Sequence, residues 1–443
     1  SGSGRCPSYH SATMGLIKQA LLILVLALAI NLIPFLWKPR PPLNVDGYFH
    51  PDFKKVADVF REWFQVRGED DGVAFALYHK GELVLDMWGG YADLESERPW
   101  HKDTISEAFS ATKGLAAIVV AMMVEKGLLD YKKPVSHYWP EFAQNGKDNI
   151  TVEMLVSHQG GLLLLDKPIH YRDLKDNVTR AEESLVNQKP VFPPGTAYGY
   201  HALTYGAYVD RLVAKADPKR RTMEQIFEEE IAKPFDIDFR MNTPKMESHR
   251  VARLRFPSLW AVIKIWILEP HRIWGFLKVV MNNSPYLKGA GSAIAGISKL
   301  EHHNNPDVRE VTISSYSGTG TARGLAKLYG ILANGGSTNG KQLLSRATIE
   351  KLSIPAVTGE EVLFKLKSII FGPGTMLKNN TKGQYMFGHP GYGGQEGYGD
   401  LNTGLGIGFI TNCINNEMAE HPLYISLKKA VSDTLDKKDD VNN

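Results

Sequence analysis

The sequence SATKGLAAIVVAMMVEK, from Ser110 to Lys126, decides how the rest of the chain is interpreted. It is apolar on nearly every side, and Gly127 directly after it is a residue type that commonly ends a helix. A helix without a polar face must be buried all round, so we expect this one to run through the middle of a domain. Its first turn carries Ser110 and Lys113, which share one face because they lie three residues apart.

This first turn has the groups of a nucleophilic site. A serine at the start of a helix has a backbone N–H that the helix does not use, and it lies at the positive end of the helix dipole. Lys113 can take the proton of Ser110 if its amine is neutral, and burial lowers the pKa of a lysine. The segment from Ser426 to Lys429 has the same spacing, but it lies within a helix pattern and is interpreted as a solvated face. Ser110 is therefore the candidate nucleophile.

A second segment, PPGTAYGYHA from Pro193 to Ala202, is a rigid turn that leads into a helix-like run from Leu203 to Ala214. Tyr200 in this segment can pass a proton between a serine and a leaving group. We expect a nearby lysine ammonium to lower the pKa of this tyrosine. The alternative interpretation is that Tyr198, Tyr200 and Tyr205 are ordinary core aromatics.

A third segment, FGHPGYGG from Phe387 to Gly394, is predicted to be a glycine-dense turn that leads into an edge. Glycines there let the backbone approach a ligand closely and aim an N–H group at an oxyanion. His389 adds a hydrogen-bond donor or a positive charge at the same place. The alternative is a loop histidine without a role, since the pattern His-x-Gly recurs at His158.

The remaining patterns predict a mixed fold. Strand-like runs occur towards the two ends of the chain, whereas the middle third is mainly helical with many loops. The predicted elements are a helix from Asp52 to Val66, a hairpin with strands 72–78 and 82–88, strands 384–388 and 404–411, and a helix from Leu423 to Leu435.

In order and spacing, the three segments resemble the serine β-lactamase-like superfamily, which includes class C β-lactamases, D-alanyl-D-alanine peptidases and related esterases. The resemblance covers about residues 52–416 and includes the connecting stretches 124–130, 150–158 and 320–326. We therefore expect an α/β protein. An antiparallel sheet from both ends of the chain should be flanked by helices, with a helical domain inserted over about residues 110–310.

The resemblance also implies a role for each candidate residue. Tyr200 corresponds to the tyrosine of the superfamily's Tyr-x-Asn element, and His389 stands where the lactamases have the lysine of Lys-Thr-Gly. The resemblance implies that Ser110 is the nucleophile and Lys113 its base partner. Tyr200 would carry a proton, and His389 would be a catalytic group that faces the substrate. The N–H groups of Ser110 and Tyr392, beside Gly391, would form the oxyanion hole.

Two departures from the superfamily pattern bear on the substrate. Ala202 replaces the asparagine of Tyr-x-Asn, so an amide that contacts a substrate carbonyl is lost. His389-Pro390-Gly391 replaces Lys-Thr-Gly, so a fixed cation and a hydroxyl that hold a carboxylate are lost. A histidine at this position resembles the pattern of the esterase and animal branches of the superfamily.

We therefore expect a serine hydrolase that acts through an acyl-enzyme on small-molecule esters or amides, or on peptides. The alternative is a catalytically silent binding or scaffolding protein that kept the fold. The presence of Ser110, Lys113 and Tyr200 together argues against it.

The N-terminal region predicts membrane attachment. After a tail, residues 1–18, the run QALLILVLALAINLIPFLW from Gln19 to Trp37 would span about 28 Å as a helix, close to the thickness of a bilayer core. We interpret it as a single-pass anchor rather than a signal peptide or a buried helix. The predicted organisation is an anchor at 19–37, a linker at 38–48, a hydrolase domain at 49–435 and a loose polar tail at 436–443.

Two opposing signals bear on which side of the membrane the hydrolase domain lies. Basic residues after the anchor, such as Lys38 and Arg40, favour a cytosolic domain. Four Asn-x-Ser/Thr triplets, which begin at Asn149, Asn177, Asn282 and Asn379, favour glycosylation and hence a lumen. We expect a luminal or extracellular domain, with a cytosolic or mitochondrial one as the alternative.

Composition excludes several other classes of protein. The chain of 443 residues has 51 Lys and Arg against 48 Asp and Glu, which argues against a nucleic-acid partner held by bulk charge. Its two cysteines, Cys6 and Cys413, lie at opposite ends and exclude a disulfide framework and a cysteine zinc site. His302-His303 is interpreted as a solvated loop, so we expect neither a metal nor another cofactor. We interpret the tryptophan-rich stretch 257–281 as a cap of the helical domain; the alternatives are a lid and an interfacial element that dips towards the membrane.

Overall fold

The computed structural model describes residues 44–67, 72–258, 284–367, 369–415 and 420–442, together with residues 23, 42, 262, 263, 266, 267, 269, 273 and 281. The predicted anchor 19–37 lies outside these residues except for Ile23, as do Asn282 and most of the stretch 257–281. Within the described part of the chain, no helix is both long enough and apolar enough to cross a bilayer. The chain divides into two units, Ser1–Pro42 and Leu43–Asn443, and the elements below belong to the second.

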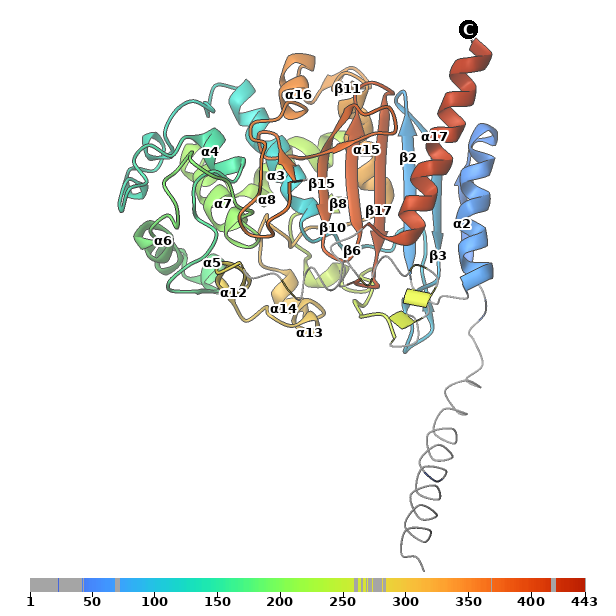
Figure 1. Ribbon diagram of the computed structural model, residues 1–443, viewed down its shortest axis with the longest axis horizontal. Helices are drawn as coiled ribbons and strands as arrows, with labels where there is room; N and C mark the ends of the chain where they lie inside the picture. The colour runs from blue at the N-terminus through green and yellow to red at the C-terminus, as the bar shows by residue number, and fades with distance from the viewer. Residues whose placement is uncertain are drawn as a thin grey trace, which may run out of the picture. The chain divides into compact units, whose positions relative to one another are not determined.

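An antiparallel sheet of eight strands is built from both ends of the chain (Figure 1). The strands are arranged in the order β1-β3-β2-β17-β16-β15-β14-β13. Strands β2 and β17 pair at the centre, which joins the N-terminal and C-terminal parts and confirms the predicted α/β class with an antiparallel sheet. The bounds are β1 (Val45–Phe49), β2 (Val73–His79), β3 (Glu82–Gly89), β13 (Ile370–Phe371), β14 (Met376–Asn379), β15 (Tyr385–Gly391), β16 (Gln395–Asp400) and β17 (Leu405–Thr411).

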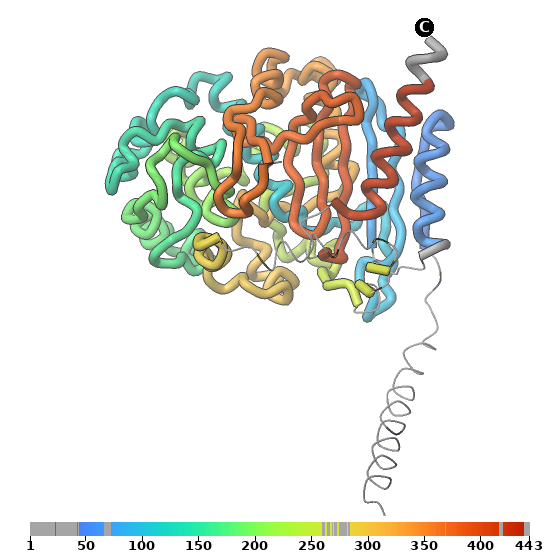
Figure 2. Tube along the Cα trace, viewed as in Figure 1, coloured from blue at the N-terminus to red at the C-terminus, as the bar shows by residue number. Residues whose placement is uncertain are grey.

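Alternation along the central strands separates two hydrophobic cores. On β2, Phe75 and Leu77 belong to one core, whereas Ala74 and Ala76 belong to the other. The face with the large side chains is covered by helices α2 (Lys54–Arg67) and α17 (Pro422–Asn442), which run side by side in Figures 1 and 2. The face with the small side chains receives helix α15 (Ala322–Ala333) and part of helix α3 (Ala111–Glu125).

Two glycines of β17 let α15 approach the sheet closely. A Cβ atom added to Gly406 would lie 2.2 Å from the Gly330 nitrogen, and one added to Gly408 would lie 2.0 Å from the Ala322 carbonyl oxygen. Such distances are too short for any side chain, so backbone of the helix occupies the space. The alternation of glycine with Leu, Ile and Phe along β17 therefore specifies a helix on one face and an apolar core on the other.

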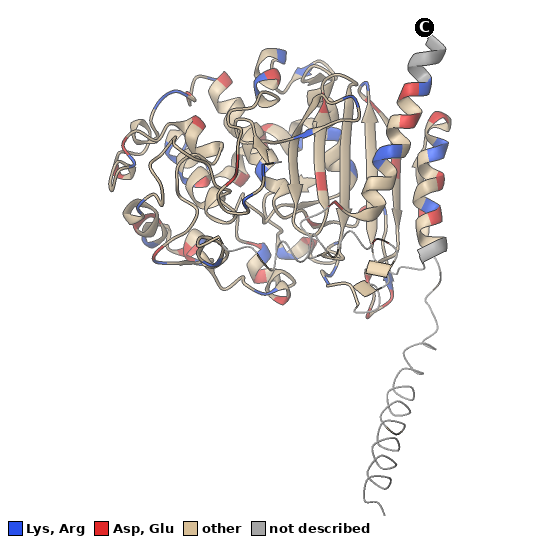
Figure 3. Ribbon diagram, viewed as in Figure 1, with Lys and Arg blue, Asp and Glu red and all other residues tan. Residues whose placement is uncertain are grey.

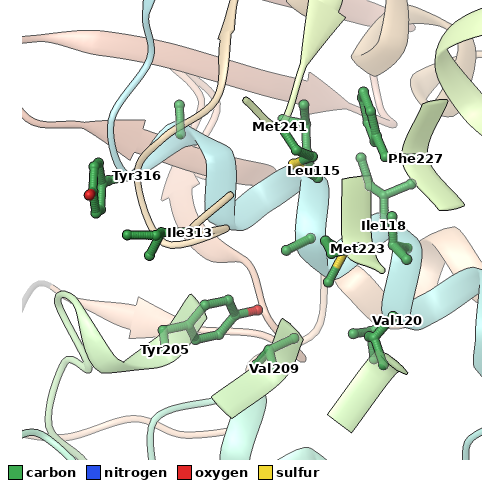
Figure 4. Close-up of a cluster of buried hydrophobic side chains, with 14 of the residues drawn as sticks. Leu115, Ile118, Val120, Tyr205, Val209, Met223, Phe227, Met241, Ile313 and Tyr316 are labelled. Carbon is green, nitrogen blue, oxygen red and sulfur yellow. The ribbon is translucent and has the colours of Figure 1, made fainter. Parts of the chain in front are cut away.

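Helix α3 confirms the prediction made from its sequence, because all its residues from Ala111 to Met123 are buried. In Figure 4, Leu115 and Ile118 of this helix lie in a cluster with Val209 and Phe227. These two partners come from helices α7 (Thr204–Ala216) and α8 (Met223–Phe227). Helix α3 also contacts β15 and β16, so it lies between the sheet and the helical region.

In the described part of the chain between α3 and α15, the regular elements are mainly helices joined by many loops, as the sequence predicts. Besides α7 and α8, its helices are α4 (Val152–Val156), α5 (Asp173–Asp176), α6 (Val178–Asn187), α9 (Lys233–Phe235), α12 (Leu287–Ser292), α13 (Leu300–His303) and α14 (Pro306–Arg309), and α16 (Arg346–Leu352) follows α15. Short strands form four small sheets, namely β6 (Ser106–Glu107) with β10 (Thr319–Gly320) and β8 (Phe239–Arg240), β4 (Tyr91–Asp93) with β5 (Arg98–Pro99), β7 (Ile169–His170) with β9 (Ile294–Ala295), and β11 (Ser337–Thr338) with β12 (Lys341–Gln342).

Three predicted boundaries are wrong. The linker 38–48 overlaps β1, whose residues alternate between half-buried and exposed as an edge strand requires. The tail is not loose over residues 436–442, because α17 continues to Asn442. The glycine-dense segment is not a turn over its whole length, because β15 pairs with β16 through His389 to Gly391. Strand β14 pairs only with Tyr385 and Met386 of β15 in the described structure, so Pro390, which lacks an N–H, is tolerated beyond them.

Charged side chains lie mainly on helices and loops rather than on the strands of the sheet (Figure 3). In the same view, blue and red residues are interspersed over the surface. This mixture agrees with the near balance of 51 basic and 48 acidic residues in the sequence.

Candidate active site

Ser110 lies at the N-terminus of α3, at the end of a turn that the fold holds firmly. The preceding residue, Phe109, has a φ of +46°, in the left-handed region that non-glycine residues rarely occupy. The turn is anchored by the pairing of Glu107 with Thr319 and by the Ala108 N–H, which donates to the Gly318 carbonyl at 2.8 Å. A strained residue next to a candidate nucleophile is typical of functional sites.

Lys113 is 0% exposed, and its side-chain nitrogen lies close to three oxygen atoms. It donates hydrogen bonds to the carbonyls of Ala202 and Ser315, each at 2.8 Å, and lies 3.2 Å from Ser110 Oγ. Burial lowers the pKa of Lys113 well below its usual value. The neutral amine, which this shift favours, is the form that can accept a proton from Ser110.

Tyr200 lies against the same pair of residues. Its hydroxyl is a hydrogen-bond partner of Ser110, and the Lys113 nitrogen is 4.7 Å from the centre of its ring. The predicted lowering of the Tyr200 pKa is wrong, because burial raises this pKa and only the contact with Ser110 opposes the shift. Burial of the hydroxyl is the main cause, and burial also favours the neutral amine of Lys113, which has no charge with which to stabilise a phenolate.

His389 lies on β15 with its ring stacked against Tyr200, at a centroid distance of 5.8 Å. Its Nδ1 is 2.6 Å from the Pro390 carbonyl and must donate there, since a carbonyl only accepts. Burial and then the charge of Lys113 lower the pKa of His389 well below its usual value, so the predicted positive charge is wrong. With the proton on Nδ1, Nε2 is a buried acceptor that has no hydrogen-bond partner among the described residues.

Gly391 and Tyr392 continue from His389 along the turn that carries Ser110. A Cβ atom on Gly391 would lie 2.1 Å from the Ala108 carbonyl oxygen, so the close approach of the two backbones requires a glycine. The Tyr392 ring makes an edge-to-face contact with Phe109 at 5.6 Å. The backbone of these two residues therefore runs beside the residues that precede Ser110.

Sequence reasoning missed the partners that act through their backbone. Ser315 and Ala202 hold Lys113 through carbonyl oxygens, which every residue type possesses, so their side chains gave no signal. The small residues around Ser315, in the run SSYSGTG from Ser314 to Gly320, are the one feature that marks a close approach of the backbone to another element.

Two side chains that support Tyr200 were also missed. Glu361 is buried and accepts hydrogen bonds from the N–H groups of Tyr200, Leu363 and Phe364, and so fixes the backbone at Tyr200. His158 packs its ring 5.1 Å from Tyr200 and accepts a hydrogen bond from the His201 N–H. A carboxylate or a histidine within a loop has no local pattern that would distinguish it, because its partners are distant in sequence.

The geometry described above defines a class of enzyme. A serine at the start of a buried helix, a buried lysine one turn later and a tyrosine in contact with both are the groups of a lysine-assisted serine hydrolase. The model of the Beta-lactamase family matches residues 60–428, and the chain belongs to this family. The protein is a serine hydrolase of that family.

Esterases are prominent among its relatives. "Esterase/beta-lactamase LipL" of Mycobacterium tuberculosis is 32% identical over 400 residues, which cover 88% of this chain and 88% of LipL. A solved family VIII carboxylesterase is 31% identical with a TM-score of 0.77, and the match covers 88% of this chain and 99% of that one. EstA from Arthrobacter nitroguajacolicus Rue61a is 28% identical with a TM-score of 0.73, over 88% of this chain and 99% of EstA. These relatives confirm the resemblance to the esterase branch.

Proposed function

We propose that this protein hydrolyses carboxylic esters through an acyl-enzyme on Ser110. The observation that carries the proposal is the distance of 3.2 Å between Lys113 Nζ and Ser110 Oγ, in a site where burial lowers the pKa of Lys113. A neutral amine at this distance takes the hydroxyl proton while Oγ attacks the substrate carbonyl. The carbonyls of Ala202 and Ser315 then hold the ammonium that forms.

Tyr200 completes the transfer of the proton. As the tetrahedral intermediate collapses, the bond to the alcohol oxygen breaks and that oxygen takes the proton of the Tyr200 hydroxyl. The Tyr200 oxygen then takes a proton from the ammonium of Lys113, which lies against the same Ser110 oxygen. Ser110 Oγ carries the acyl group at this stage and no proton. In the second half, a water loses a proton to the same amine and its oxygen attacks the acyl carbon. The bond to Ser110 Oγ breaks, Oγ takes the proton back from the ammonium of Lys113, and the acid is released.

The N–H groups of Ser110 and Tyr392 are the proposed oxyanion hole. Support comes from the position of Ser110 at the start of α3, where the helix dipole favours negative charge, and from the approach of Gly391 to the turn before it. Two fixed N–H donors aimed at the developing oxyanion stabilise it most strongly in a site that excludes water.

An uncharged ester fits this site better than a β-lactam does. Burial keeps His389 neutral, so it offers no cation to a substrate carboxylate. Pro390 has no hydroxyl and Ala202 has no side-chain amide. The names of LipL, the family VIII carboxylesterase and EstA support an ester as the substrate class.

Labelling with a fluorophosphonate probe tests the proposal, because it needs an activated serine and no knowledge of the natural substrate. We expect the wild-type protein to be labelled and to cleave p-nitrophenyl acetate, and Ser110→Ala to lose both properties. Ser426→Ala is the matched control, since Ser426 has the same spacing to a lysine but is exposed on α17. Labelling of the Ser110→Ala protein at the wild-type rate would contradict the assignment.

We also propose that residues 19–37 anchor the protein in a membrane with the hydrolase domain on the luminal or extracellular side. The apolar run and the exposed positions of Asn149, Asn177 and Asn379 support this arrangement. The full chain should then resist carbonate extraction, whereas a chain that begins at Leu43 should not sediment with membranes. Thr179→Ala removes the triplet at Asn177 but keeps the Asn177 side chain that caps α6. Loss of a glycosidase-sensitive band in this variant supports the luminal side, and the absence of such a band in the wild type supports the cytosolic or mitochondrial alternative.

A further inference from the structure

His303 at the end of α13 is not part of a solvated loop, as the sequence suggested, but is largely buried. Its side chain is 12% exposed, and Nδ1 lies 2.8 Å from the Glu107 carboxylate. Its other ring nitrogen, Nε2, lies 3.2 Å from the Ile297 carbonyl. No local pattern indicates this contact, because Glu107 lies 196 residues away along the chain.

The two partners of His303 determine its charge. A carboxylate and a carbonyl both accept hydrogen bonds, so each ring nitrogen must donate, and only the imidazolium has two N–H groups. Electrostatics agree with the geometry. Burial lowers the pKa of His303, but the charge of Glu107 and the hydrogen bonds to Glu107 and Ile297 raise it further, to above its usual value.

The imidazolium contacts both segments that position the reacting groups. Its ring centre is 5.3 Å from that of Phe109, the residue before Ser110, and 5.4 Å from that of Tyr316, the residue after Ser315. Phe109 in turn packs against Tyr392. One side chain thus lies against the turn that presents the serine and against the loop whose carbonyl holds Lys113.

The other titratable groups around this pair do not replace His303. Burial lowers the pKa of Arg309 on α14 and Glu107 raises it, so Arg309 is a second basic neighbour of Glu107. Burial raises the pKa of Tyr316 and of Tyr392. Both tyrosines therefore stay neutral over the range in which a histidine titrates.

We propose that His303, as an imidazolium bound to Glu107 and Ile297, is a positioning residue that holds the Ser110 turn and the Ser315 loop in their reactive arrangement. This inference rests on the proposed esterase function. Phe109 keeps its unfavourable φ only while neighbouring groups enforce it, so removing the pair allows the turn to relax and moves Ser110. Displacements of about 1 Å in an active site can cost on the order of 10² in rate.

The role predicts a pH profile with two limbs. Turnover rises with pH as Lys113 loses its proton, since the neutral amine is the base. It falls again at higher pH as His303 loses its proton, because the neutral ring can satisfy only one of its two acceptors. A histidine that served only to fill space would give no alkaline limb.

The experiment compares His303→Gln with His302→Gln, its neighbour on α13. The measurement is kcat and KM for p-nitrophenyl acetate from about pH 5 to pH 10. We expect His303→Gln to lower kcat about tenfold or more, to change KM little and to remove the alkaline limb. His302→Gln should retain both limbs, because the His302 Nδ1 accepts a hydrogen bond from the Lys299 N–H instead. Wild-type kcat and an intact alkaline limb in His303→Gln would overturn the proposal.

Two further measurements test the proposal even if His303→Gln does not fold. Glu107→Gln keeps the shape of the partner but removes its charge, so the alkaline limb should move to lower pH, and an unmoved limb would contradict the role. The wild-type profile is itself decisive, since the absence of an alkaline limb would overturn the proposal without any variant. Failure of fluorophosphonate to label the wild type would instead contradict the proposed function, so the two failures are distinguishable.

Discussion

Lys113 and Lys147 are both 0% exposed, and each nitrogen lies within hydrogen-bond distance of three oxygens, yet their surroundings suit different tasks. Lys147 donates to the carbonyls of Gln144, Val186 and Gln188 at 2.6 to 2.8 Å. Lys113 has two carbonyls, and its third partner is the Ser110 hydroxyl. Since both nitrogens have three hydrogen-bond partners, the kind of partner and the surroundings must decide which lysine acts as a catalytic base.

Burial lowers the pKa of both lysines. Burial lowers that of Lys147 to about 8, and it lowers that of Lys113 well below its usual value. Three carbonyls stabilise the ammonium of Lys147, which ties the loop at Gln144 to the end of α6. Lys113 lies on a helix buried on every side, between the rings of Tyr200 and Tyr205, where its charge is harder to keep. We infer that Lys147 is structural and that Lys113 is the base.

The largest expected effect comes from replacing each lysine by a side chain of similar length. Lys113→Met should lower kcat/KM for an ester by up to about 10⁴, because burial raises the pKa of Tyr200, the other group in contact with Ser110, and keeps it a proton donor. Lys147→Met should leave kcat within about twofold, since Lys147 does not touch the reacting groups. Steady-state kinetics on the folded fraction, checked by circular dichroism, measures both. An equal loss of kcat in the two variants would break the comparison.

The next effect concerns the substrate. Because the site holds a neutral His389 where a cation would bind a carboxylate, kcat/KM for a cephalosporin should be about 10³ below that for a nitrophenyl ester. The estimate adds one lost charge-assisted contact and two neutral ones. Both substrates are measured on one preparation. A cephalosporin turned over as well as the ester would mean that the charge state inferred for this site is wrong.

The lowered pKa values of the two lysines should make the free energy of unfolding depend on pH. Below pH 8 the Lys147 amine is protonated whether the protein is folded or unfolded, whereas between about 8 and its usual 10.5 only the unfolded chain keeps the proton. The unfolded state then binds more protons, so the free energy of unfolding rises with pH, by up to about 3 kcal/mol. Lys147→Met should lose this rise.

Chemical denaturation at a series of pH values checks the prediction and sharpens it. We expect Lys113→Met to lose a rise that begins at a lower pH than the one lost in Lys147→Met, because a hydroxyl takes the place of one of the three carbonyls that hold the Lys147 ammonium. Two rises that begin at the same pH would show that the two sites do not differ as inferred.

The smallest effect concerns the tyrosine that passes the proton. Tyr200→Phe should lower kcat about 10²-fold, because the ring and its packing remain while the hydroxyl that contacts Ser110 is lost. Tyr198→Phe is the control, since the Tyr198 hydroxyl donates to the Gly359 and Ile369 carbonyls and not to the site. A larger loss of kcat in Tyr198→Phe than in Tyr200→Phe would show that Tyr198, and not Tyr200, passes the proton.

Patterns local to the chain predicted much of the fold. The hairpin of β2 and β3, helix α3 and strand β17 follow from periodicity over a few residues. Strand β16 was missed because it is buried on both faces and its sequence QEGYGD does not alternate. Strand β1 and the extension of β15 through Pro390 depend on pairing with a neighbour, which a single segment does not encode.

The candidate site shows the same division. Ser110, Lys113, Tyr200 and His389 were predicted because their side chains have recognisable chemistry, and the structure brings all four together. The predicted direction of the Tyr200 pKa shift was wrong because it is set by burial, which depends on how distant segments pack around the hydroxyl. The contributions of Ser315 and His303 depend on contacts between distant segments, and no local pattern shows them.

The most direct test of the account is the pKa of the Lys113 amine itself, measured by NMR on protein with isotope-labelled lysine. Spectra of Lys113→Met and Lys147→Met identify the two signals by their loss. The account predicts that Lys113 titrates below Lys147, whose pKa is about 8, and at the same pH as the acid limb of kcat/KM. A Lys113 amine that titrates at or above the pKa of Lys147 would contradict its role as the base.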